Sequence, residues 1–315
     1  MINIIVTGGA GNIGSALVTN LLNKNKYKVI IIDNFVTGKE YKLPSKKNKN
    51  WKLLKININK VKNINKLIQF KKIDYIFHFA ALVGVKRTLN NPLNVLDDIE
   101  GMKNILTLSK YFKVKRLFYS SSSEVYGESI SFPQNENNTP LNSRLPYAAV
   151  KNICEAYIKT YNKEYHLNYT IFRFFNTYGP NQSEEFVITK FINKAINNET
   201  IEIYGDGKQS RTFCYIDDNI YACIKCLEDD KYINSTINIG SEFEINMKNL
   251  AKKIKKLSNS KSLISYIDPL VEGDMFRRVP DLTKMKKLIS QKKFTNLDHG
   301  ILKTLKEIKK KNNKC

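Results

Sequence analysis

The chain has 315 residues, 42% of them hydrophobic, and a formal net charge of +23 from 52 Lys and Arg against 29 Asp and Glu. This length favours two domains or one large α/β unit, and the composition excludes a disordered chain. No apolar run reaches the ~18 residues of a membrane-spanning helix, so no membrane association is expected. The first residues show no secretory signal pattern, and five cysteines in so long a chain are typical of reduced thiols. A cytoplasmic location is therefore expected.

The positive charge is spread along the chain, with local lysine clusters at 46–49 and in the tail 306–315. No zinc-finger spacing and no RNA-binding sheet signature accompanies it. We interpret it as a lysine-rich solvated surface that at most attracts a dianionic small molecule, so no specific nucleic-acid partner is expected. The three histidines are scattered, and Cys223 and Cys226 fall inside a helical run, so no metal site is predicted.

Strand-length apolar runs and amphipathic helical stretches alternate through the first half of the chain. Most of the runs are apolar on both faces, which is typical of parallel strands covered by helices on both sides. Strands are predicted at 3–7, 28–33, 51–56, 75–79, 116–120 and 169–174, and helices at 13–23, 61–70, 95–111 and 147–165. The alternation predicts right-handed βαβ units and hence an α/β fold with a doubly wound parallel sheet, a Rossmann fold.

The pattern loosens after residue 176. Strands are predicted at 201–204, 211–215, 236–239 and 263–266, and helices at 187–197, 217–228, 247–257 and 297–309. We interpret this half as a smaller C-terminal α+β lobe that binds the substrate. The expected domains are therefore 1–176 and, for the most part, 177–315, with the chain crossing between the two lobes.

A glycine-rich turn joins the first predicted strand to the first helix. Gly8, Gly11 and Gly14 have a spacing that permits a tight turn and lets backbone N–H groups approach a pyrophosphate at a helix N-terminus. Asp33 ends the next strand, where a carboxylate binds the 2′-hydroxyl of a ribose and repels a 2′-phosphate. The sequence therefore predicts a dinucleotide site that prefers NAD to NADP.

Tyr147 and Lys151 stand four residues apart, on one face of a predicted helix. An ammonium lowers the pKa of a nearby phenol, so a phenolate at Tyr147 could act as general base on a substrate alcohol. The segment SSSSEVYG at 120–127 adds hydroxyls and a carboxylate at the end of an earlier strand. Ligands of α/β folds bind at this edge of the sheet, so the pattern predicts oxidation of an alcohol with NAD.

With these motifs in order, the sequence resembles the extended short-chain dehydrogenase/reductase family, and within it the nucleotide-sugar epimerases, dehydratases and decarboxylases. The resemblance covers nearly the whole chain. It is carried by Tyr147 with Lys151 and by TGGAGNIG at 7–14, HFAA at 78–81, SSSEVYG at 121–127, FRFFNTYGP at 172–180, YGDGKQSRTFCYIDD at 204–218 and RRVPD at 277–281.

The resemblance implies a role for each matching position. Ser122 would bond the 4-hydroxyl of the sugar together with Tyr147, and Arg211 and Arg278 would clamp a diphosphate with their planar guanidinium groups. The implied cofactor-binding residues are Gly8, Gly11, Asn12, Ile13, Gly14, Asp33, Asn34, Asn57, Ile58, Ala80, Ala81, Tyr147 and Lys151. The implied substrate-binding residues are Ser123, Asn176, Val187, Tyr204, Arg211 and Arg278. Asn57 replaces an Asp that contacts adenine in the family, and its amide oxygen can still accept a hydrogen bond.

Glu124 bears on the reaction that follows oxidation of the sugar at C4. Simple 4-epimerases of the family have a small or hydroxyl residue there, whereas decarboxylases and dehydratases have Glu. The resemblance therefore favours a UDP-glucuronate decarboxylase that forms UDP-xylose, although Phe186 stands where decarboxylases have Arg. The alternatives are a 4-epimerase, then a 4,6-dehydratase, and, as a non-enzyme, an epimerase-like RNA-binding protein.

The partners that the resemblance implies are NAD and a nucleoside-diphosphate sugar, with UDP as the first expectation. Members of the family form homodimers through a four-helix contact. The corresponding helices of this chain are those predicted at 95–111 and 147–165.

Overall fold

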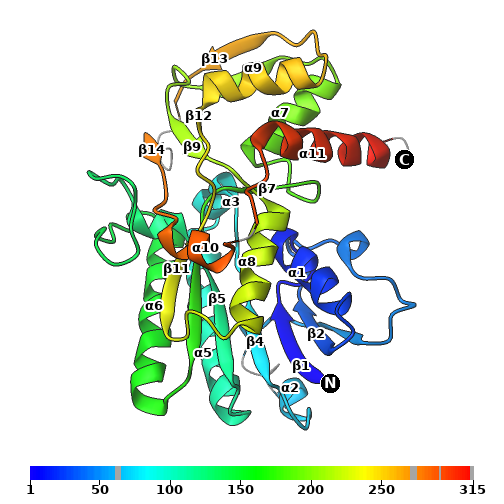
Figure 1. The fold of residues 1–315 in the computed structure, drawn as a ribbon, viewed down its shortest axis with the longest axis vertical. Helices are drawn as coiled ribbons and strands as arrows, with labels where there is room; N and C mark the ends of the chain where they lie inside the picture. Colours follow the sequence, from blue (N-terminus) through cyan, green and yellow to red (C-terminus); the bar gives the residue numbers. More distant parts are fainter. Residues whose placement is uncertain (61–64, 270–274, 291, 313–315) are drawn as a thin grey trace. The chain divides into compact units, whose positions relative to one another are not determined.

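The computed structural model describes residues 1–60, 65–269, 275–290 and 292–312 (Figure 1). None of the helices in these residues is long and apolar enough to cross a membrane. The chain divides into two compact units that interleave along the sequence. Unit 1 comprises residues 1–125, 143–173 and 220–237, and unit 2 comprises 126–142, 174–219 and 238–315.

Unit 1 is built on a seven-stranded sheet with the strand order β11-β6-β5-β4-β1-β2-β3. The pairs β1 with β2, β2 with β3, β1 with β4 and β4 with β5 are all parallel. Most of the strands are apolar on both faces because helices cover both sides of such a sheet. Their bounds are β1 (Ile2–Thr7), β2 (Tyr27–Asp33), β3 (Trp51–Lys55), β4 (Tyr75–His78), β5 (Arg116–Ser122), β6 (Tyr169–Phe174) and β11 (Ser235–Ile239).

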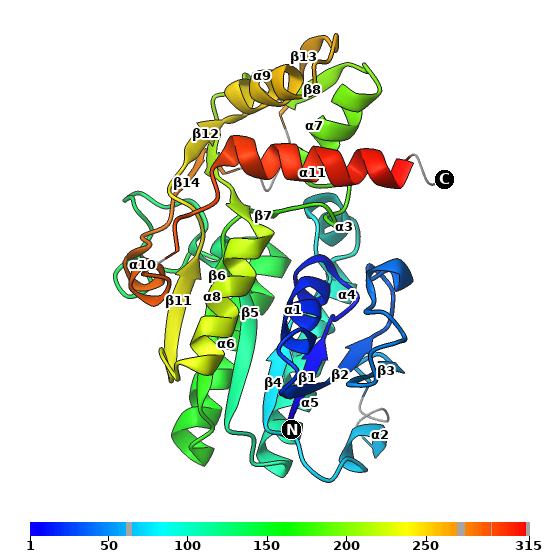
Figure 2. The same cartoon turned by 45° about the vertical axis from the view of Figure 1, so that its right-hand side comes forward.

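Helices cover both faces of this sheet (Figure 2). Buried side chains of α5 and α6, such as Ile105 and Ile158, form one core cluster with Ile5 and Leu117 of the sheet. The helix α1 and the unit 1 part of α8 lie over the opposite face (Figure 2). The helices are α1 (Asn12–Leu22), α2 (Asn65–Ile68), α3 (Val85–Asn90), α4 (Pro92–Leu96), α5 (Asp98–Tyr111), α6 (Pro146–Tyr165) and α8 (Ile216–Glu228), with short 3-10 turns η1 (Glu40–Lys42) and η3 (Ser123–Tyr126).

The predicted strands of the first half are present within one or two residues of their expected bounds, and the doubly wound sheet is confirmed. The single helix predicted at 95–111 is wrong, because Asp97 separates α4 from α5. Part of the helix predicted at 61–70 lies outside the described residues, and α2 spans Asn65–Ile68. The helix α3 was not predicted, because its six residues VKRTLN show no apolar period.

The described residues of unit 2 form three small sheets. In one of them, β9 (Ser210–Thr212) runs between β12 (Glu244–Asn246), which is antiparallel, and β14 (Arg277–Arg278), which is parallel. The others pair β8 (Ile201–Tyr204) with β13 (Ile264–Ile267), and β7 (Thr177–Tyr178) with β10 (Cys214–Tyr215). The helices of this unit are α7 (Val187–Ile196), α9 (Met247–Leu257), α10 (Thr283–Leu288) and α11 (Leu297–Asn312).

Two predicted elements of the second half differ in the structure. The strand expected at 236–239 is β11, which joins the large sheet beside β6 instead of a sheet of the smaller lobe. The strand expected at 211–215 is divided into β9 and β10, which pair with different partners. One boundary between the units falls between residues 173 and 174, and the chain crosses between the units elsewhere, since 126–142 fall in unit 2 and 220–237 in unit 1.

Candidate active site

The turn between β1 and α1 can be formed only by small residues. Gly8 has a φ of +68°, and a Cβ there would lie 2.8 Å from backbone atoms of Phe79 and Ala80 at the end of β4. A Cβ on Gly14 would lie 2.1 Å from the carbonyl oxygen of Gly8. The glycines therefore let the turn fold against itself and against the neighbouring strand, as the predicted motif requires.

The N-terminus of α1 is open to an anion. Gly11 is its N-cap without any side-chain cap, and the first turn contains no acidic residue. Asn12 and Ile13 follow in this turn and are partly exposed. Uncapped N–H groups and the positive end of the helix dipole together favour a phosphate, so the turn fits the pyrophosphate of a dinucleotide.

Asp33 connects the glycine-rich turn to the end of β2. One carboxylate oxygen accepts the N–H of Ala10 at 2.9 Å, and the other accepts the N–H of Phe35 at 2.8 Å. Each oxygen has a second lone pair, so the buried carboxylate can still accept a ribose hydroxyl. Asn34 is exposed, and its side-chain oxygen accepts the N–H of Val36 at 3.1 Å.

The other predicted cofactor residues follow β3 and β4. The Asn57 amide oxygen, expected at the adenine, accepts the N–H of Asn59 at 2.9 Å in its own turn. The Ile58 side chain is 5% exposed and belongs to the core of unit 1. Ala80 donates its N–H to Thr7 Oγ1 at 3.1 Å, and Ala81 is partly exposed beside it. Asn57 is therefore held by its own turn, Ile58 by its buried side chain and Ala80 by its backbone N–H.

Thr7 and His78 form a pair that the sequence analysis missed. Thr7 Oγ1 lies 2.8 Å from His78 Nδ1 and accepts the N–H groups of Phe79 and Ala80. Burial lowers the pKa of His78 to about 3, so the imidazole is neutral at physiological pH. The pair fixes the ends of β1 and β4, and a lone histidine in a strand gives no sequence signal for such a role.

Tyr147 and Lys151 lie together on α6, as their spacing predicts. The Lys151 Nζ is 5.7 Å from the centre of the Tyr147 ring and donates to the carbonyl oxygen of Ser120 at 2.7 Å. Tyr147 is partly exposed, whereas Lys151 is only 3% exposed. Burial lowers the pKa of Lys151, and the nearby carboxylate of Asp98 opposes this shift. An ammonium is thus held beside a phenol at the carboxyl end of β5.

The carboxyl end of β5 carries the predicted hydroxyl and carboxylate. Ser122 ends the strand, and its Oγ accepts the N–H of Glu124 at 3.2 Å. Both side chains are partly exposed, while Ser123 between them is buried. Unit 1 therefore contains all four predicted catalytic residues, namely Tyr147, Lys151, Ser122 and Glu124.

A buried ion pair supports this strand and was missed by the sequence analysis. Glu155 on α6 receives two hydrogen bonds from Arg173 on β6, at 3.0 and 2.7 Å, and both side chains are almost fully buried. Ser121 Oγ donates to the same carboxylate at 2.6 Å. Glu155 stands four residues after Lys151, so one helix contacts β5 at both positions. The sequence signal that could have indicated this pair is Arg173, an arginine inside the mostly apolar strand β6.

Unit 2 contains the two arginines expected to bind a diphosphate. Arg211 on β9 and Arg278 on β14 are register partners on neighbouring strands and are 7% and 5% exposed. The guanidinium of Arg211 donates to the carbonyl oxygens of Ser210 and Phe276. Two positive charges at paired positions favour a ligand with two negative charges, which a diphosphate supplies.

The remaining predicted substrate residues also lie in unit 2. Asn176 donates its side-chain amide to the carbonyl oxygen of Thr212 at 3.0 Å. Val187 is the first residue of α7, and Tyr204 ends β8 with the Lys190 Nζ 5.3 Å from its ring centre. All three side chains are partly exposed.

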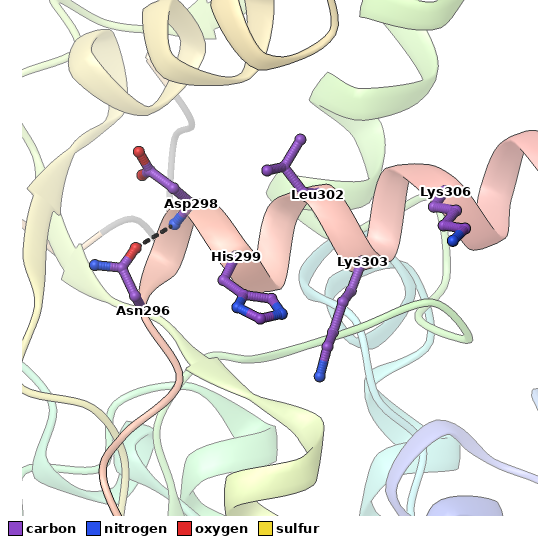
Figure 3. Close-up of a pocket in the computed structure, with 6 residues that line it drawn as sticks. All are labelled: Asn296, Asp298, His299, Leu302, Lys303 and Lys306. Carbon is purple, nitrogen blue, oxygen red and sulfur yellow. Dashed lines mark hydrogen bonds between the residues drawn. The ribbon is translucent and has the colours of Figure 1, made fainter.

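A surface hollow along α11 is lined by Asn296, Asp298, His299, Leu302, Lys303 and Lys306 (Figure 3). Asn296 Oδ1 accepts the N–H of Asp298 at 2.9 Å and so supports the first turn of the helix. None of the predicted site residues lines this hollow. In the described part of the chain, no group of three or more His, Cys, Asp or Glu is arranged to hold a metal ion.

Residues 4–240 match the model of the NAD dependent epimerase/dehydratase family. The chain is 35% identical to a putative UDP-glucose 4-epimerase of Methanocaldococcus jannaschii, over 98% of this chain and 99% of that protein. It is 33% identical to a UDP-N-acetyl-alpha-D-glucosaminuronate decarboxylase of Bacillus cytotoxicus, over 96% of both chains. It is also 31% identical to UDP-glucuronic acid decarboxylase 6 of Arabidopsis thaliana, over 95% of this chain and 86% of that one.

Solved structures show the same fold. The UDP-glucose 4-epimerase of Thermotoga maritima, crystallised with UDP-glucose, has a TM-score of 0.92 and 30% identity, and covers 99% of this chain and 100% of its own. The UDP-glucuronic acid 4-epimerase of Bacillus cereus, a mutant in complex with a fluorinated UDP-glucuronic acid and NAD, has a TM-score of 0.89 and 27% identity. That match covers 98% of this chain and 99% of the Bacillus cereus one.

Proposed function

Because the chain belongs to the NAD dependent epimerase/dehydratase family, we propose that it decarboxylates UDP-glucuronate through a transient 4-keto sugar. The chain is an NAD-dependent enzyme, and its glycine-rich turn, uncapped α1 N-terminus and Asp33 fit that cofactor. Bound NAD supplies a reversible acceptor for the hydride of an alcohol. The chain's own residues must then bind the sugar nucleotide, take up the hydroxyl proton and direct the fate of the ketone.

Tyr147 is the proposed base for the 4-hydroxyl of the sugar. Its phenolate would accept the hydroxyl proton while the Ser122 hydroxyl bonds the same oxygen. The Lys151 ammonium, 5.7 Å from the Tyr147 ring centre, stabilises the phenolate by its charge. Arg211 and Arg278, register partners on β9 and β14, would hold the diphosphate.

Glu124 is the residue on which the proposed choice between the reactions depends. A ketone at C4 turns the carboxylate at C6 into a β-keto acid, whose C5–C6 bond breaks with its electrons moving into the ketone as CO₂ leaves. The enolate then needs one proton at C5, and a carboxylic acid can supply it. Glu124 lies two residues beyond Ser122, to whose hydroxyl its backbone N–H donates at 3.2 Å, so the end of β5 carries both a hydroxyl and a carboxyl group. The proposal of decarboxylation is supported by the resemblance to decarboxylases at this position.

A 4-epimerase is the second candidate. The Methanocaldococcus relative and the Thermotoga structure bear that name, and Phe186 replaces the arginine expected of a decarboxylase. Phe186 is the N-cap residue of α7, and Lys190 one turn later lies 3.7 Å from Glu202. A 4,6-dehydratase is the third candidate. An RNA-binding role is disfavoured, because the Tyr147 and Lys151 pair of an enzyme is intact.

The substitution Glu124→Gln separates a decarboxylase or a dehydratase from a 4-epimerase. If Glu124 transfers a proton, the variant should lose about 10²-fold or more in kcat, because an amide cannot donate that proton. The measurement is the initial rate with UDP-glucuronate. The control is Glu128→Gln, which removes the same charge from an exposed neighbouring position and should leave the rate unchanged. A rate for Glu124→Gln within a few-fold of wild type would favour an epimerase.

A homodimer through α5 and α6 belongs to the same proposal. Three large side chains of these helices are exposed, namely Tyr111 at 57%, Ile153 at 42% and Tyr165 at 48%. Burial of such side chains between two copies would stabilise a dimer. Light scattering should give twice the mass of 36.4 kDa, and Ile153→Glu should shift the protein toward the monomer. A monomer in the wild type would refute the dimer.

A further inference from the structure

The three-stranded sheet of unit 2 carries Arg211 and Arg278, the residues proposed to hold the diphosphate. Its strand order is β12-β9-β14, so β9 separates the other two strands. Arg211 on β9 and Arg278 on β14 are register partners. Ser210 and Arg277 form the pair one residue earlier. Successive side chains of a strand point to opposite faces of its sheet. Arg211 and Arg278 are therefore buried on one face, whereas Arg277 lies on the other and reaches solvent.

Arg277 is held by a carboxylate from the far edge of this sheet. Its Nε and Nη2 donate to the two oxygens of Glu244 on β12, each at 2.9 Å. Ser210 Oγ on the central strand donates to Glu244 Oε1 at 2.5 Å. The hydrogen bonds from Arg277 are the main cause that holds the pKa of Glu244 below its usual range, so the carboxylate is charged at neutral pH. One bidentate ion pair thus spans β9 and ties both edge strands together.

The strand β14 is short and depends on side-chain contacts. It has only two residues, fewer than a strand usually has, so its backbone ladder supplies few hydrogen bonds. The N–H of Gln134 donates to the carbonyl oxygen of Val279, just beyond the strand, at 2.8 Å. From the same segment as Gln134, the Phe132 ring has its centre 4.9 Å from the Arg277 guanidinium carbon. The Arg277 guanidinium therefore contacts both Glu244 and an aromatic ring, and it anchors β14.

The positions of both buried arginines depend on where β14 lies. Arg278 follows Arg277 directly, and its guanidinium donates to Met275 Sδ at 2.9 Å within the same segment. The guanidinium of Arg211 donates across to the carbonyl oxygen of Phe276 at 3.3 Å. A shift of β14 would therefore move Arg278 itself and an acceptor of Arg211. A diphosphate needs the two guanidinium groups at a fixed separation, because each planar fork must meet its own phosphate oxygens.

We propose that Glu244 and Arg277 are positioning residues whose ion pair sets the separation of the two buried arginines for a diphosphate. This inference rests on the proposed function in one respect, since it takes the diphosphate of a sugar nucleotide as the ligand of those arginines. Glu244 and Arg277 lie on the opposite face of the sheet and act on that ligand through β14. Loss of the ion pair would let Arg278 move away from Arg211.

The substitution Glu244→Gln removes the charge of the carboxylate and keeps its shape. The affinity for UDP, measured by calorimetry on the protein with NAD, should fall by about tenfold, which is the effect of losing one charged hydrogen bond to the diphosphate. The direction of the change is informative. Removal of a negative charge near two arginines would by itself strengthen the binding of an anion. Weaker binding therefore reports lost positioning and not the change in charge.

Glu242→Gln is the matched control, because Glu242 pairs with Lys286 at 2.8 Å on the surface and loses the same charge. It should bind UDP as the wild type does. Arg277→Gln should weaken UDP binding as much as Glu244→Gln, and the double variant should bind no more weakly than either, since the two residues act as one unit. Ser210→Ala keeps both charges and should weaken UDP binding by a few-fold, which tests the proposal if Glu244→Gln fails to fold. Unchanged or tighter binding in Glu244→Gln, or in Ser210→Ala in its place, would overturn the proposal.

Turnover separates this proposal from the proposed function. With UDP-glucuronate, Glu244→Gln should raise KM while kcat changes little, because the ion pair serves binding in the ground state and the transition state alike. A merely structural role would lower the yield of active enzyme and leave KM unchanged. If the wild type binds UDP but releases no CO₂ from UDP-glucuronate, the proposed reaction fails, while the UDP affinities still decide the role of Glu244 and Arg277. A wild type that does not bind UDP would refute this proposal as well.

Discussion

Tyr147→Phe is expected to lower turnover by about 10³-fold, since general base catalysis contributes on the order of 10² to 10⁴ in rate. The variant lacks the hydroxyl that would accept the substrate proton, and the rest of the ring is retained. Lys151 would keep its bond to the carbonyl oxygen of Ser120, so the cofactor site should remain intact. NAD should therefore still bind, as measured by calorimetry, while kcat falls.

Tyr161→Phe is the control for this experiment. Tyr161 lies on the same helix, packs against the core of unit 1 and is not one of the predicted catalytic residues. It should retain wild-type turnover. Wild-type-like turnover in Tyr147→Phe would remove Tyr147 as the base and with it the proposed chemistry of unit 1.

Arg173→Met is expected to cost about 3–5 kcal/mol in the free energy of unfolding, because it leaves the buried Glu155 carboxylate without its charge partner. Arg173 and Glu155 have side chains only 2% and 1% exposed. Methionine fills much of the volume, so the loss reports on the unpaired charge more than on a cavity. Urea unfolding followed by circular dichroism measures the effect.

Lys225→Met is the control, because Lys225 pairs with Asp229 at 2.7 Å on the surface of α8. An exposed pair of this kind contributes at most about 1 kcal/mol, so this variant should unfold nearly as the wild type does. Equal stability of the two variants would show that the Glu155 and Arg173 pair does not hold α6 against β5 and β6.

The sequence predicted most strands of the large sheet because most of them are short runs apolar on both faces. The sequence does not show which sheet a strand joins. The residues TINI of β11 look the same whether they join the large sheet or a small lobe, and only the tertiary pairing with β6 decides between them. The two-residue strand β14 carries no periodic signal at all, yet it places Arg278 beside Arg211.

The site was predictable where a residue acts through its own chemistry and spacing, as for Gly8, Gly14, Tyr147 and Lys151. It was not predictable where a residue acts through a distant partner. Glu155 looks like one of several polar residues of the helix predicted at 147–165, and its bond to Arg173 comes from the fold alone.

The central claim is decarboxylation, and the mass of the product tests it most directly. The purified enzyme with NAD is incubated separately with UDP-glucuronate and with UDP-glucose, and each mixture is analysed by mass spectrometry. Loss of a mass equal to CO₂ from UDP-glucuronate, with UDP-glucose unchanged, is the predicted result. A new isomer of unchanged mass, or a loss equal to water from UDP-glucose, would contradict it.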